Sequence, residues 1–245
     1  MNEHRPVAIV TGASRGIGAA IVAVLREHDW SVVGADLEPS ESLRDENVRM
    51  IEGDVTDEQL WDRLVDAAQE LGELRGIVNN AGVQGPGARL AETSLADFAA
   101  NITINTHGAF LGTRAGLRSL RSGGSIVNIA SNAGFRGVPR YGPYVAAKHA
   151  VVGLTRSAAI EGARDGIRVN AVAPGPTQTR IMDAVADSFN AASPAAAREK
   201  LTAANPSRRF AEPAEVAEAV MWLLGEKSGY VTGTVMPVDG GLTAL

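Results

Sequence analysis

The chain of 245 residues contains no cysteine. This absence excludes a disulfide framework and catalysis by a thiolate. Aromatic residues make up only 4% of the chain, but hydrophobic residues as a whole make up 45%, which is enough for a sizeable core. No apolar run reaches the length needed to cross a membrane.

Basic runs are also missing, and the formal net charge is −5. This balance favours neither a nucleic acid nor a membrane surface as a partner. Residues 1–5 lead almost directly into an apolar segment, which leaves no room for a signal peptide. We therefore expect a cytoplasmic protein, and the sequence predicts no metal site.

Tyr144 and Lys148 stand four residues apart in a chain with only three tyrosines and three lysines. Such a pair is expected by chance about 0.04 times, so a motif with a mechanism is the better interpretation. Residues four apart share a helix face, which places an ammonium group beside a phenol. This charge is predicted to lower the pKa of Tyr144 from its ordinary value of about 10, towards the range of a general acid or base.

A glycine-rich turn lies near the N-terminus. Residues 6–10 form a short apolar run rich in β-branched residues, which predicts a buried strand. Thr-Gly-Ala-Ser-Arg-Gly-Ile-Gly follows at 11–18, and apolar residues then recur at helical spacing. A strand, a glycine turn and a helix start together predict an anion site, because the backbone can approach a pyrophosphate and free N–H groups point at it.

The rest of the chain alternates between predicted strands and helices. Strands are expected at 31–35, 48–51, 76–79, 125–131, 167–172 and 231–237, and helices at about 94–120, 143–162 and 212–224. Thr56 and Gln59 have the spacing of a capping box, which predicts another helix start. The alternation favours one α/β domain over residues 1–245, Rossmann-like, with a doubly wound parallel sheet and helices on both faces. Ligands of such sheets bind at the carboxyl ends of the strands.

Several motifs together resemble the short-chain dehydrogenase/reductase family, from Val7 to Gly241. They are the glycine turn, Asn-Asn-Ala-Gly at 79–82, Ile-Asn-Thr at 104–106, the apolar strand ending in Ser131, the Tyr144–Lys148 pair, Pro-Gly at 174–175 and Val-Asp-Gly-Gly at 238–241. The resemblance implies an enzyme that transfers a hydride between a nicotinamide dinucleotide and a small molecule, interconverting a secondary alcohol and a ketone.

The resemblance also implies roles for four catalytic residues. Tyr144 would pass a proton to or from the substrate oxygen, and Lys148 would lower its pKa and hydrogen-bond the nicotinamide ribose. Ser131, thirteen residues before Tyr144, would hold the substrate oxygen. Asn105 would anchor a water molecule that continues the proton path from Lys148.

A larger set of residues is expected to bind the dinucleotide. Besides Tyr144 and Lys148, the set contains Gly12, Ser14, Arg15, Gly16, Ile17, Gly18, Asp36, Leu37, Asp54, Val55, Asn80, Ala81, Gly82, Pro174, Gly175, Thr177 and Thr179. By resemblance, Asp54 and Val55 lie against the adenine, and the turn at 174–175 lies beside the nicotinamide.

Asp36 is the residue that predicts which dinucleotide is bound. It lies eighteen residues after Gly18, close to the roughly 20-residue spacing of an acid that binds the adenosine ribose. A carboxylate there accepts hydrogen bonds from the ribose of NAD and opposes the 2′-phosphate of NADP, and Leu37 supplies no compensating cation. Arg15 is the contrary signal, since it could reach a 2′-phosphate, although it can also turn to solvent. We expect NAD to be preferred over NADP.

Tyr141 offers an alternative reaction. Tyr-x6-Lys resembles the related enoyl reductases, which reduce a carbon–carbon double bond. Pro143 argues against it, because proline suits the first helical turn and leaves Tyr141 outside the helix, as a wall of the substrate pocket. A catalytically silent dinucleotide-binding sensor is a further alternative, but all four catalytic positions are filled.

Residues 176–210 form a long connection before the last helix, and connections of this length are often lids over the substrate. Apolar residues recur in it at helical spacing, namely Ile181, Met182, Val185 and Phe189. The alternative is a helix packed on the body or on another subunit. A lid with an apolar face would favour an uncharged ketone or secondary alcohol, whereas three arginines leave a carboxylate open, namely Arg136, Arg140 and Arg180.

The family resemblance further implies a homotetramer. The long helices near Asn105 and Tyr144 would pack against their mates in one interface. The last helix and the last strand would form a second interface.

Overall fold

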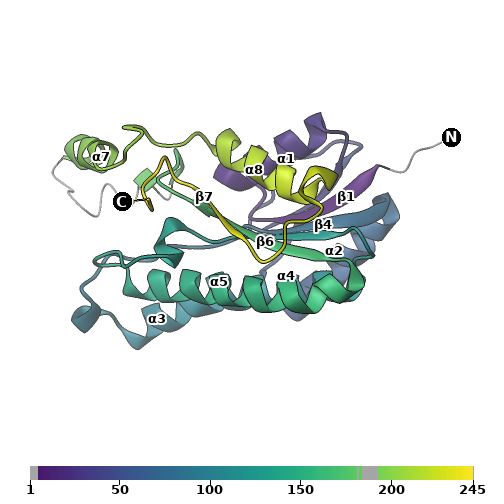
Figure 1. The fold of residues 1–245 in the computed structure, drawn as a ribbon, viewed down its shortest axis with the longest axis horizontal. Helices are drawn as coiled ribbons and strands as arrows, with labels where there is room; N and C mark the ends of the chain where they lie inside the picture. Colours follow the sequence, from purple (N-terminus) through teal and green to yellow (C-terminus); the bar gives the residue numbers. More distant parts are fainter. Residues whose placement is uncertain (1–4, 181, 184–192, 245) are drawn as a thin grey trace.

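The computed structural model describes residues 5–180, 182–183 and 193–244. Its centre is a seven-stranded parallel sheet in the order β3-β2-β1-β4-β5-β6-β7 (Figure 1). The strands are β1 (Pro6–Thr11), β2 (Ser31–Asp36), β3 (Val48–Glu52), β4 (Glu73–Asn79), β5 (Ser125–Ile129), β6 (Arg168–Pro174) and β7 (Val235–Val238). The order reverses between β1 and β4, which makes this point the topological switch of a doubly wound sheet.

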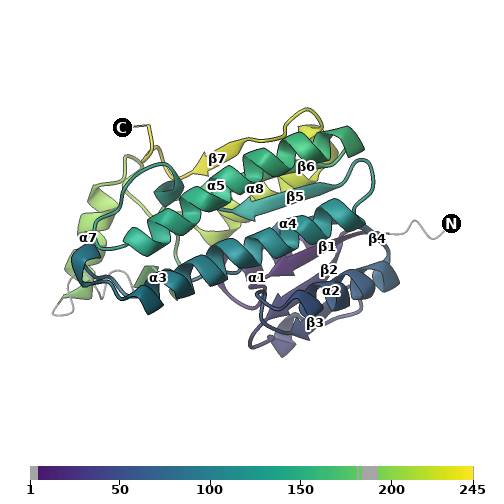
Figure 2. The same cartoon turned by 90° about the horizontal axis from the view of Figure 1, so that it is seen from below.

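Helices cover both faces of the sheet, as predicted (Figures 1 and 2). One face carries α1 (Gly16–Glu27) and α8 (Pro213–Leu224), which pack against each other. The other carries α2 (Glu58–Leu71), α3 (Leu95–Ile102), α4 (Gly108–Ser119) and α5 (Gly142–Gly162). Another helix, α7 (Pro194–Ala203), lies beyond the carboxyl ends of the strands. The chain is thus a Rossmann-like α/β fold.

Hydrophobic clusters lie on both faces of the sheet. Along β1, Ala8 and Val10 belong to the core under α1 and α8, whereas Val7 and Ile9 belong to the core under α2 and α4. All four side chains are fully buried. A strand that is covered on both faces needs a continuous apolar run, which is the pattern that predicted it.

Several element boundaries differ from the predictions. The N-cap of α2 is Asp57, whose side chain accepts from Gln59 N at 3.0 Å, so the capping box predicted from Thr56 is wrong. The strand predicted at 76–79 begins earlier, at Glu73, because β4 pairs with β1 from Pro6 onwards. The last strand is shorter than 231–237, because β7 pairs with β6 only over Val235–Val238. The helix predicted at 94–120 contains a π-helical turn.

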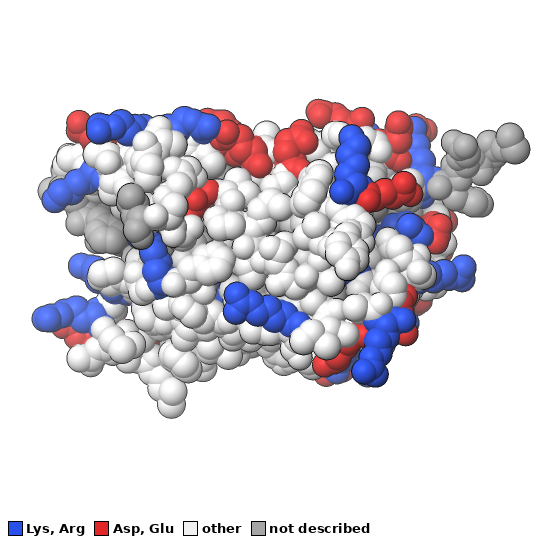
Figure 3. All heavy atoms as spheres, viewed as in Figure 1, with Lys and Arg blue, Asp and Glu red and all other residues white. Residues whose placement is uncertain are grey.

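The face that carries β7 shows few charged side chains in its middle (Figure 3). Charged residues gather around the rim of this face instead. The elements at this side carry exposed apolar side chains, including Ile160 on α5, Trp222 on α8 and Tyr230 before β7. β7 itself is an edge strand that pairs only with β6 among the strands described.

Candidate functional site

The carboxyl ends of the strands open into one cavity of about 1090 Å³. All four predicted catalytic residues line it, and so does every predicted dinucleotide-binding residue except Gly18. The lining runs in sequence from Gly12 to Leu242. Parallel strands end at the same edge of a sheet, which is why residues so far apart in the chain share one cavity.

The glycine turn between β1 and α1 forms part of this cavity. Gly12 has a φ of +62°, a left-handed conformation that favours glycine, and a Cβ atom there would lie 3.0 Å from Ala81 Cα. Gly18 lies behind the turn, where a Cβ atom would overlap the carbonyl oxygen of Gly12. Gly18 therefore allows α1 to pack closely on the turn, without lining the cavity itself.

The N-terminus of α1 has the features of an anion site. Arg15, at its N-cap, is extended with a φ of −147°, and no side chain caps the helix. The first turn contains no acidic residue. The N–H groups of this turn are therefore not committed to a capping side chain. With the close backbone approach at Gly12, they fit the pyrophosphate of a dinucleotide.

Asp36 ends β2 at the wall of the same cavity. Its Oδ2 accepts from Ser14 N at 3.0 Å, and its Oδ1 accepts from Glu38 N at 3.2 Å. These bonds hold the carboxylate beside the glycine turn. Arg15, the contrary signal in the sequence, forms an ion pair with Glu38 at 2.9 Å. The guanidinium therefore already has an acidic partner within the chain.

Asp54 and Val55 follow β3 and line the cavity. Oδ1 of Asp54 accepts from the backbone N–H of Thr56 at 2.9 Å and from its hydroxyl group at 2.8 Å. These bonds shape the turn that leads into α2, so Asp54 also has a structural task. Leu37 lines the same cavity and remains 65% exposed.

The segment after β4 joins the glycine turn to the centre of the sheet. Asn80 Nδ2 donates to the carbonyl oxygens of Thr11 and Gly12 at 2.8 and 3.1 Å. Asn79 Nδ2 donates to Asn128 Oδ1 on β5 at 2.8 Å. One asparagine thus fixes the turn and the other links two neighbouring strands.

Tyr144 and Lys148 lie on α5, which begins at Gly142 with Pro143 in its first turn. The start predicted from the proline is confirmed. Tyr141 is the N-cap residue, outside the helix, and it is 2% exposed while lining the cavity. Lys148 Nζ lies 5.6 Å from the centroid of the Tyr144 ring. The phenol and the ammonium group therefore share one face of α5.

The end of β5 meets this face of α5. Ser131 forms a side-chain hydrogen bond with Tyr144, and its Oγ also accepts from Ala133 N at 3.1 Å. Lys148 Nζ donates to the carbonyl oxygen of Ile129 at 2.9 Å. The serine, the tyrosine and the lysine are thus brought together by one strand end and one helix.

Burial shifts the pKa values of Tyr144 and Lys148. Burial raises the pKa of Tyr144 above 10.0, although the hydrogen bond with Ser131 acts in the opposite direction. Burial also lowers the pKa of Lys148 from 10.5 to about 8. The prediction that Lys148 holds the pKa of Tyr144 below its ordinary value is therefore wrong for the structure described. Withdrawal of water from the phenolate outweighs the hydrogen bond with Ser131.

Asn105 lies in the π-helical turn Thr103–His107 between α3 and α4, and it is 1% exposed. Its Nδ2 donates to the carbonyl oxygen of Val83 at 2.7 Å, and its Oδ1 accepts from Val83 N at 3.2 Å. Nδ2 also donates to the carbonyl oxygen of Asn101 at 3.1 Å. Single π turns inside helices are frequent at functional sites. Here the side chain clamps the backbone that lines the cavity.

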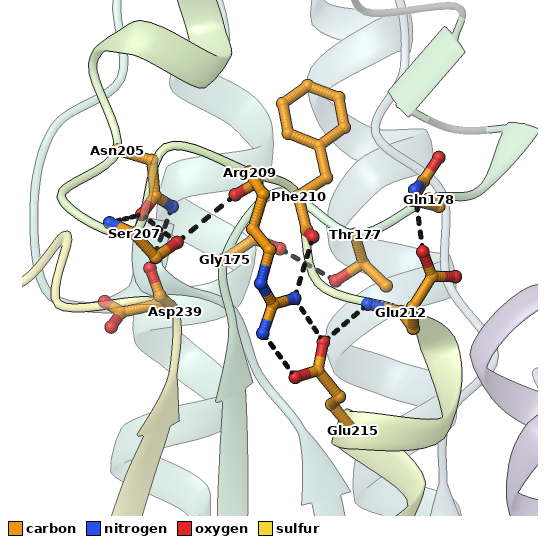
Figure 4. Close-up of polar contacts among 10 residues, drawn as sticks. All are labelled: Gly175, Thr177, Gln178, Asn205, Ser207, Arg209, Phe210, Glu212, Glu215 and Asp239. Carbon is orange, nitrogen blue, oxygen red and sulfur yellow. Dashed lines mark hydrogen bonds and ion pairs between the residues drawn. The ribbon is translucent and has the colours of Figure 1, made fainter.

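The turn after β6 is held by the C-terminal segment (Figure 4). Gly175 packs so closely on Asp239 that a Cβ atom there would lie 2.7 Å from Asp239 Cα. Thr177 Oγ1 donates to the carbonyl oxygen of Gly175 at 3.0 Å, and Thr179 Oγ1 donates to that of Thr177 at 3.3 Å. Asn205 Nδ2 donates to the carbonyl oxygen of Asp239 at 3.0 Å. The turn at 174–175, which is predicted to lie beside the nicotinamide, is therefore held in place by its packing on Asp239 and by the hydrogen bond of Thr177.

The connection at 176–210 contains α7, and Met182, Leu201 and Ala204 of this stretch line the cavity. Ile181, Val185 and Phe189 of the predicted apolar face lie outside the described residues. Arg198 on α7 binds Asp183 at 2.7 Å, and its guanidinium lies over the Phe210 ring. Arg198 thus contacts described residues on both sides of α7.

Among the site residues that were not predicted from the sequence, three have specific positions or contacts. Glu38 binds Arg15, Val83 is clamped by Asn105, and Asn132 lines the cavity beside Ser131. Only Glu38 gave a signal, as a second acid two residues after Asp36. Neighbours in the fold, and not the local sequence, determine the roles of the other two.

The buried Lys148 leads to a prediction on stability. Its pKa of about 8, against 10.5, means that the unfolded chain binds more protons between these pH values. Below pH 8 the buried ammonium therefore lowers the free energy of unfolding, and this loss fades as the pH rises towards 10.5. Lys148→Met is expected to increase the free energy of unfolding more at pH 7 than at pH 10.5, by up to about 3 kcal/mol.

Urea denaturation of both proteins without dinucleotide measures this difference. Lys227→Met, at an exposed lysine, is the matched control and should show no such dependence on pH. An equal effect of Lys148→Met at both pH values would contradict a depressed lysine pKa.

The described residues contain no cluster of three or more His, Cys, Asp or Glu side chains that could hold a metal ion. Among the helices in this part of the chain, none combines the length and the apolar character needed to span a bilayer.

Comparison with known proteins gives consistent matches over nearly the whole chain. A family model described as "Enoyl-(Acyl carrier protein) reductase" matches residues 12–243. Levodione reductase of Leifsonia aquatica is 36% identical over 251 residues, covering 97% of this chain and 94% of the relative. Cis-4-hydroxycyclohexanecarboxylate dehydrogenase of Sinomonas cyclohexanicum is 41% identical over 250 residues, covering 98% and 97%.

Solved structures agree with these matches. The crystal structure of levodione reductase superposes with a TM-score of 0.93 at 36% identity, covering 98% of each chain. The structure of ElxO with NADP bound has a TM-score of 0.89 at 30% identity, covering 99% of this chain and 100% of the other. The relatives named are dehydrogenases and reductases, and the fold and the sequence motifs agree with theirs. The chain therefore belongs to the short-chain dehydrogenase/reductase family of nicotinamide-dependent oxidoreductases.

Proposed function

We propose that this protein interconverts a secondary alcohol and a ketone, with NAD as its dinucleotide and Tyr144 as the general acid and base. The observation that carries the proposal is the convergence of Ser131, Tyr144 and Lys148 in the same cavity as the glycine turn. The named relatives support the substrate class, since one is a levodione reductase and another is a dehydrogenase of cis-4-hydroxycyclohexanecarboxylate.

The residues of the chain have distinct tasks in this reaction. When bound, the nicotinamide would supply hydride transfer to or from the carbon that bears the oxygen. Ser131 hydrogen-bonds the substrate oxygen. Tyr144 gives a proton to this oxygen in reduction and removes it in oxidation. The raised pKa keeps Tyr144 protonated at neutral pH, which is the form that reduction requires.

Lys148 and Asn105 act around the tyrosine. The Lys148 ammonium lies on the same helix face as the phenol and is proposed to bind the nicotinamide ribose and to pass protons on from Tyr144. Asn105 contacts the backbone of Val83 and lies close to Gly82, where a Cβ atom would be 2.5 Å from its Oδ1. We propose that it holds the water that continues the proton path.

Residues 12–18, Asp36, Leu37, Asp54 and Val55 are proposed to hold the adenosine and pyrophosphate parts of the dinucleotide. Residues 80–82 and 174–179 would hold the nicotinamide part. Thr177 and Thr179 form hydrogen bonds within the turn after β6. We therefore propose that they contribute to dinucleotide binding by fixing the conformation of this turn. The single domain of residues 1–245 would close over the substrate with the segment 176–210, because Met182 and Leu201 already line the cavity.

Reduction of a carbon–carbon double bond by Tyr141 is the second candidate, and the wording of the matching family model favours it. The geometry supports it less, because Tyr141 precedes α5 and does not share the Lys148 face. A catalytically silent sensor is the third candidate. Only the residues proposed to bind the dinucleotide support it, because the catalytic positions would then have no task.

The decisive experiment is to incubate the protein with NAD and a panel of secondary alcohols, and with NADH and the matching ketones. Change in the absorbance of the reduced nicotinamide is expected. Turnover of an enoyl substrate alone would favour the Tyr141 reaction, and dinucleotide binding without any turnover would favour the sensor.

We also propose a homotetramer. The largely uncharged face at β7 and the exposed apolar residues on α5 and α8 support one interface. Exposed apolar residues on α3 and α4, Leu95, Phe98 and Phe110, support the other. Light scattering coupled to gel filtration is expected to give four times the 25.5 kDa chain mass. A monomer at working concentration would contradict the proposal.

A further inference from the structure

The catalytic end of the cavity contains an amide donor without an acceptor. Asn132 directly follows Ser131, is 9% exposed and lines the cavity. Its Oδ1 accepts from Ser131 Oγ at 3.3 Å, but its Nδ2 donates to no acceptor in the part of the chain that the structure describes. Nδ2 is not one of the fully buried side-chain atoms that lack a partner in the described residues, so it is open to the cavity, where it can donate to a ligand.

Two arginines line the same cavity. Arg136 follows the short helical turn at 132–134, and Arg180 follows Thr179 after β6. Neither forms an ion pair or a hydrogen bond with the described residues. Arg15, by contrast, is neutralised by Glu38. Arg136 and Arg180 are thus the cavity arginines whose charge no described acid balances.

The charges of the cavity wall are separated along its length. Among the described residues, the acids that line it are Asp36 and Asp54, and both belong to the proposed adenosine end beside the glycine turn. None of the described lining residues around Ser131 and Tyr144 is an acid, while Lys148 and Arg136 are basic. Arg180 lines the same cavity and follows Thr179, whose side chain would lie 3.2 Å from a Cβ atom at Gly16. An anionic group on the substrate is therefore attracted to the catalytic end and repelled from the other.

We propose that the substrate carries a carboxylate on a carbon remote from the reacting one, and that Arg136, Arg180 and the Asn132 amide bind it. This inference rests on the proposed alcohol–ketone function and deepens it. The planar guanidinium suits a carboxylate, because its N–H groups match the two oxygens. Val138, Tyr141 and Leu201 also line the cavity and suit the hydrocarbon part of the molecule. The expectation of an uncharged substrate is replaced by an apolar skeleton with one negative charge.

The test compares hydroxycyclohexanecarboxylates with their methyl esters, which keep the ring and the hydroxyl group and lose the charge. With NAD, the acid is expected to have at least about tenfold higher kcat/KM than the ester, a factor that fits hydrogen bonds to a charged group. Arg136→Gln and Arg180→Gln are each expected to raise the KM for the acid several-fold or more. The KM for the ester should stay unchanged in both variants.

Arg164→Gln is the matched control, because Arg164 is exposed in the turn after α5 and does not line the cavity. Arg164→Gln should change the KM for neither the acid nor the ester. The Kd for NAD, measured by quenching of protein fluorescence, should stay the same in all three variants. If Arg180→Gln raises this Kd and leaves the KM for the acid unchanged, Arg180 belongs to the dinucleotide site and the proposal is wrong for it.

The outcomes distinguish a failure of the carboxylate proposal from a failure of the proposed alcohol–ketone function. Equal or better turnover of the ester, turnover of uncharged alcohols alone, or an unchanged KM in both arginine variants overturns the carboxylate and leaves the proposed function standing. Failure to turn over any alcohol or ketone overturns both.

Discussion

Tyr144→Phe is expected to reduce kcat by about 10²–10⁴-fold, the range in which a positioned general acid or base contributes. The change removes only the hydroxyl group that transfers the proton. The ring keeps its place on α5 and its contact with Lys148, whose Nζ lies 5.6 Å from the ring centroid. The Kd for NAD should therefore change little, and fluorescence titration measures it independently of turnover.

Tyr141→Phe is the matched control in the same cavity. It makes the identical chemical change at the N-cap of α5, off the Lys148 face. Most of the activity should remain. If Tyr141→Phe abolishes turnover while Tyr144→Phe retains it, the roles of the two tyrosines are reversed and the enoyl-reductase mechanism is correct.

A preference for NAD over NADP of about 10²-fold in kcat/KM is expected from the opposed charges of Asp36 and a 2′-phosphate. Asp36→Asn should lower this preference by at least about tenfold. The asparagine keeps an acceptor oxygen for Ser14 N but loses the charge and the second acceptor, which serves Glu38 N, whereas Asp36→Ala would lose both hydrogen bonds that hold the turn.

Glu38 permits a second step in this experiment. It binds Arg15 at 2.9 Å, so Glu38→Gln in the Asp36→Asn background releases a cation towards NADP. The pair is largely exposed, which makes a further gain of a few-fold the expected size. Adding Arg15→Gln should remove that gain. Equal or better efficiency with NADP in the unmodified protein would refute the assignment of NAD.

The Asp36–Glu38 turn shows how far the local sequence reaches. The position of Asp36 after a β-branched strand follows from the sequence, because a strand and a turn are set by neighbouring residues. The partner of Arg15 does not, because Glu38 is 23 residues away and only the pairing of β1 with β2 brings the two turns together. The sequence therefore leaves Arg15 available to bind a phosphate, whereas in the structure Arg15 already forms an ion pair with Glu38.

The sequence by itself determined the alternation of strands and helices, the glycine turn and the shared helix face of Tyr144 and Lys148. These follow from spacing, from apolar periodicity and from the fixed φ of Pro143, all of which act over a few residues. The tertiary structure alone decided the direction in which the pKa of Tyr144 shifts, the hydrogen bonds of Asn105 to Val83 and the unpaired amide of Asn132 beside Ser131. The reason is that burial and long-range hydrogen bonds depend on every element that packs around a side chain, so the same phenol expected to be more acidic beside a lysine becomes less acidic once water is withdrawn from it.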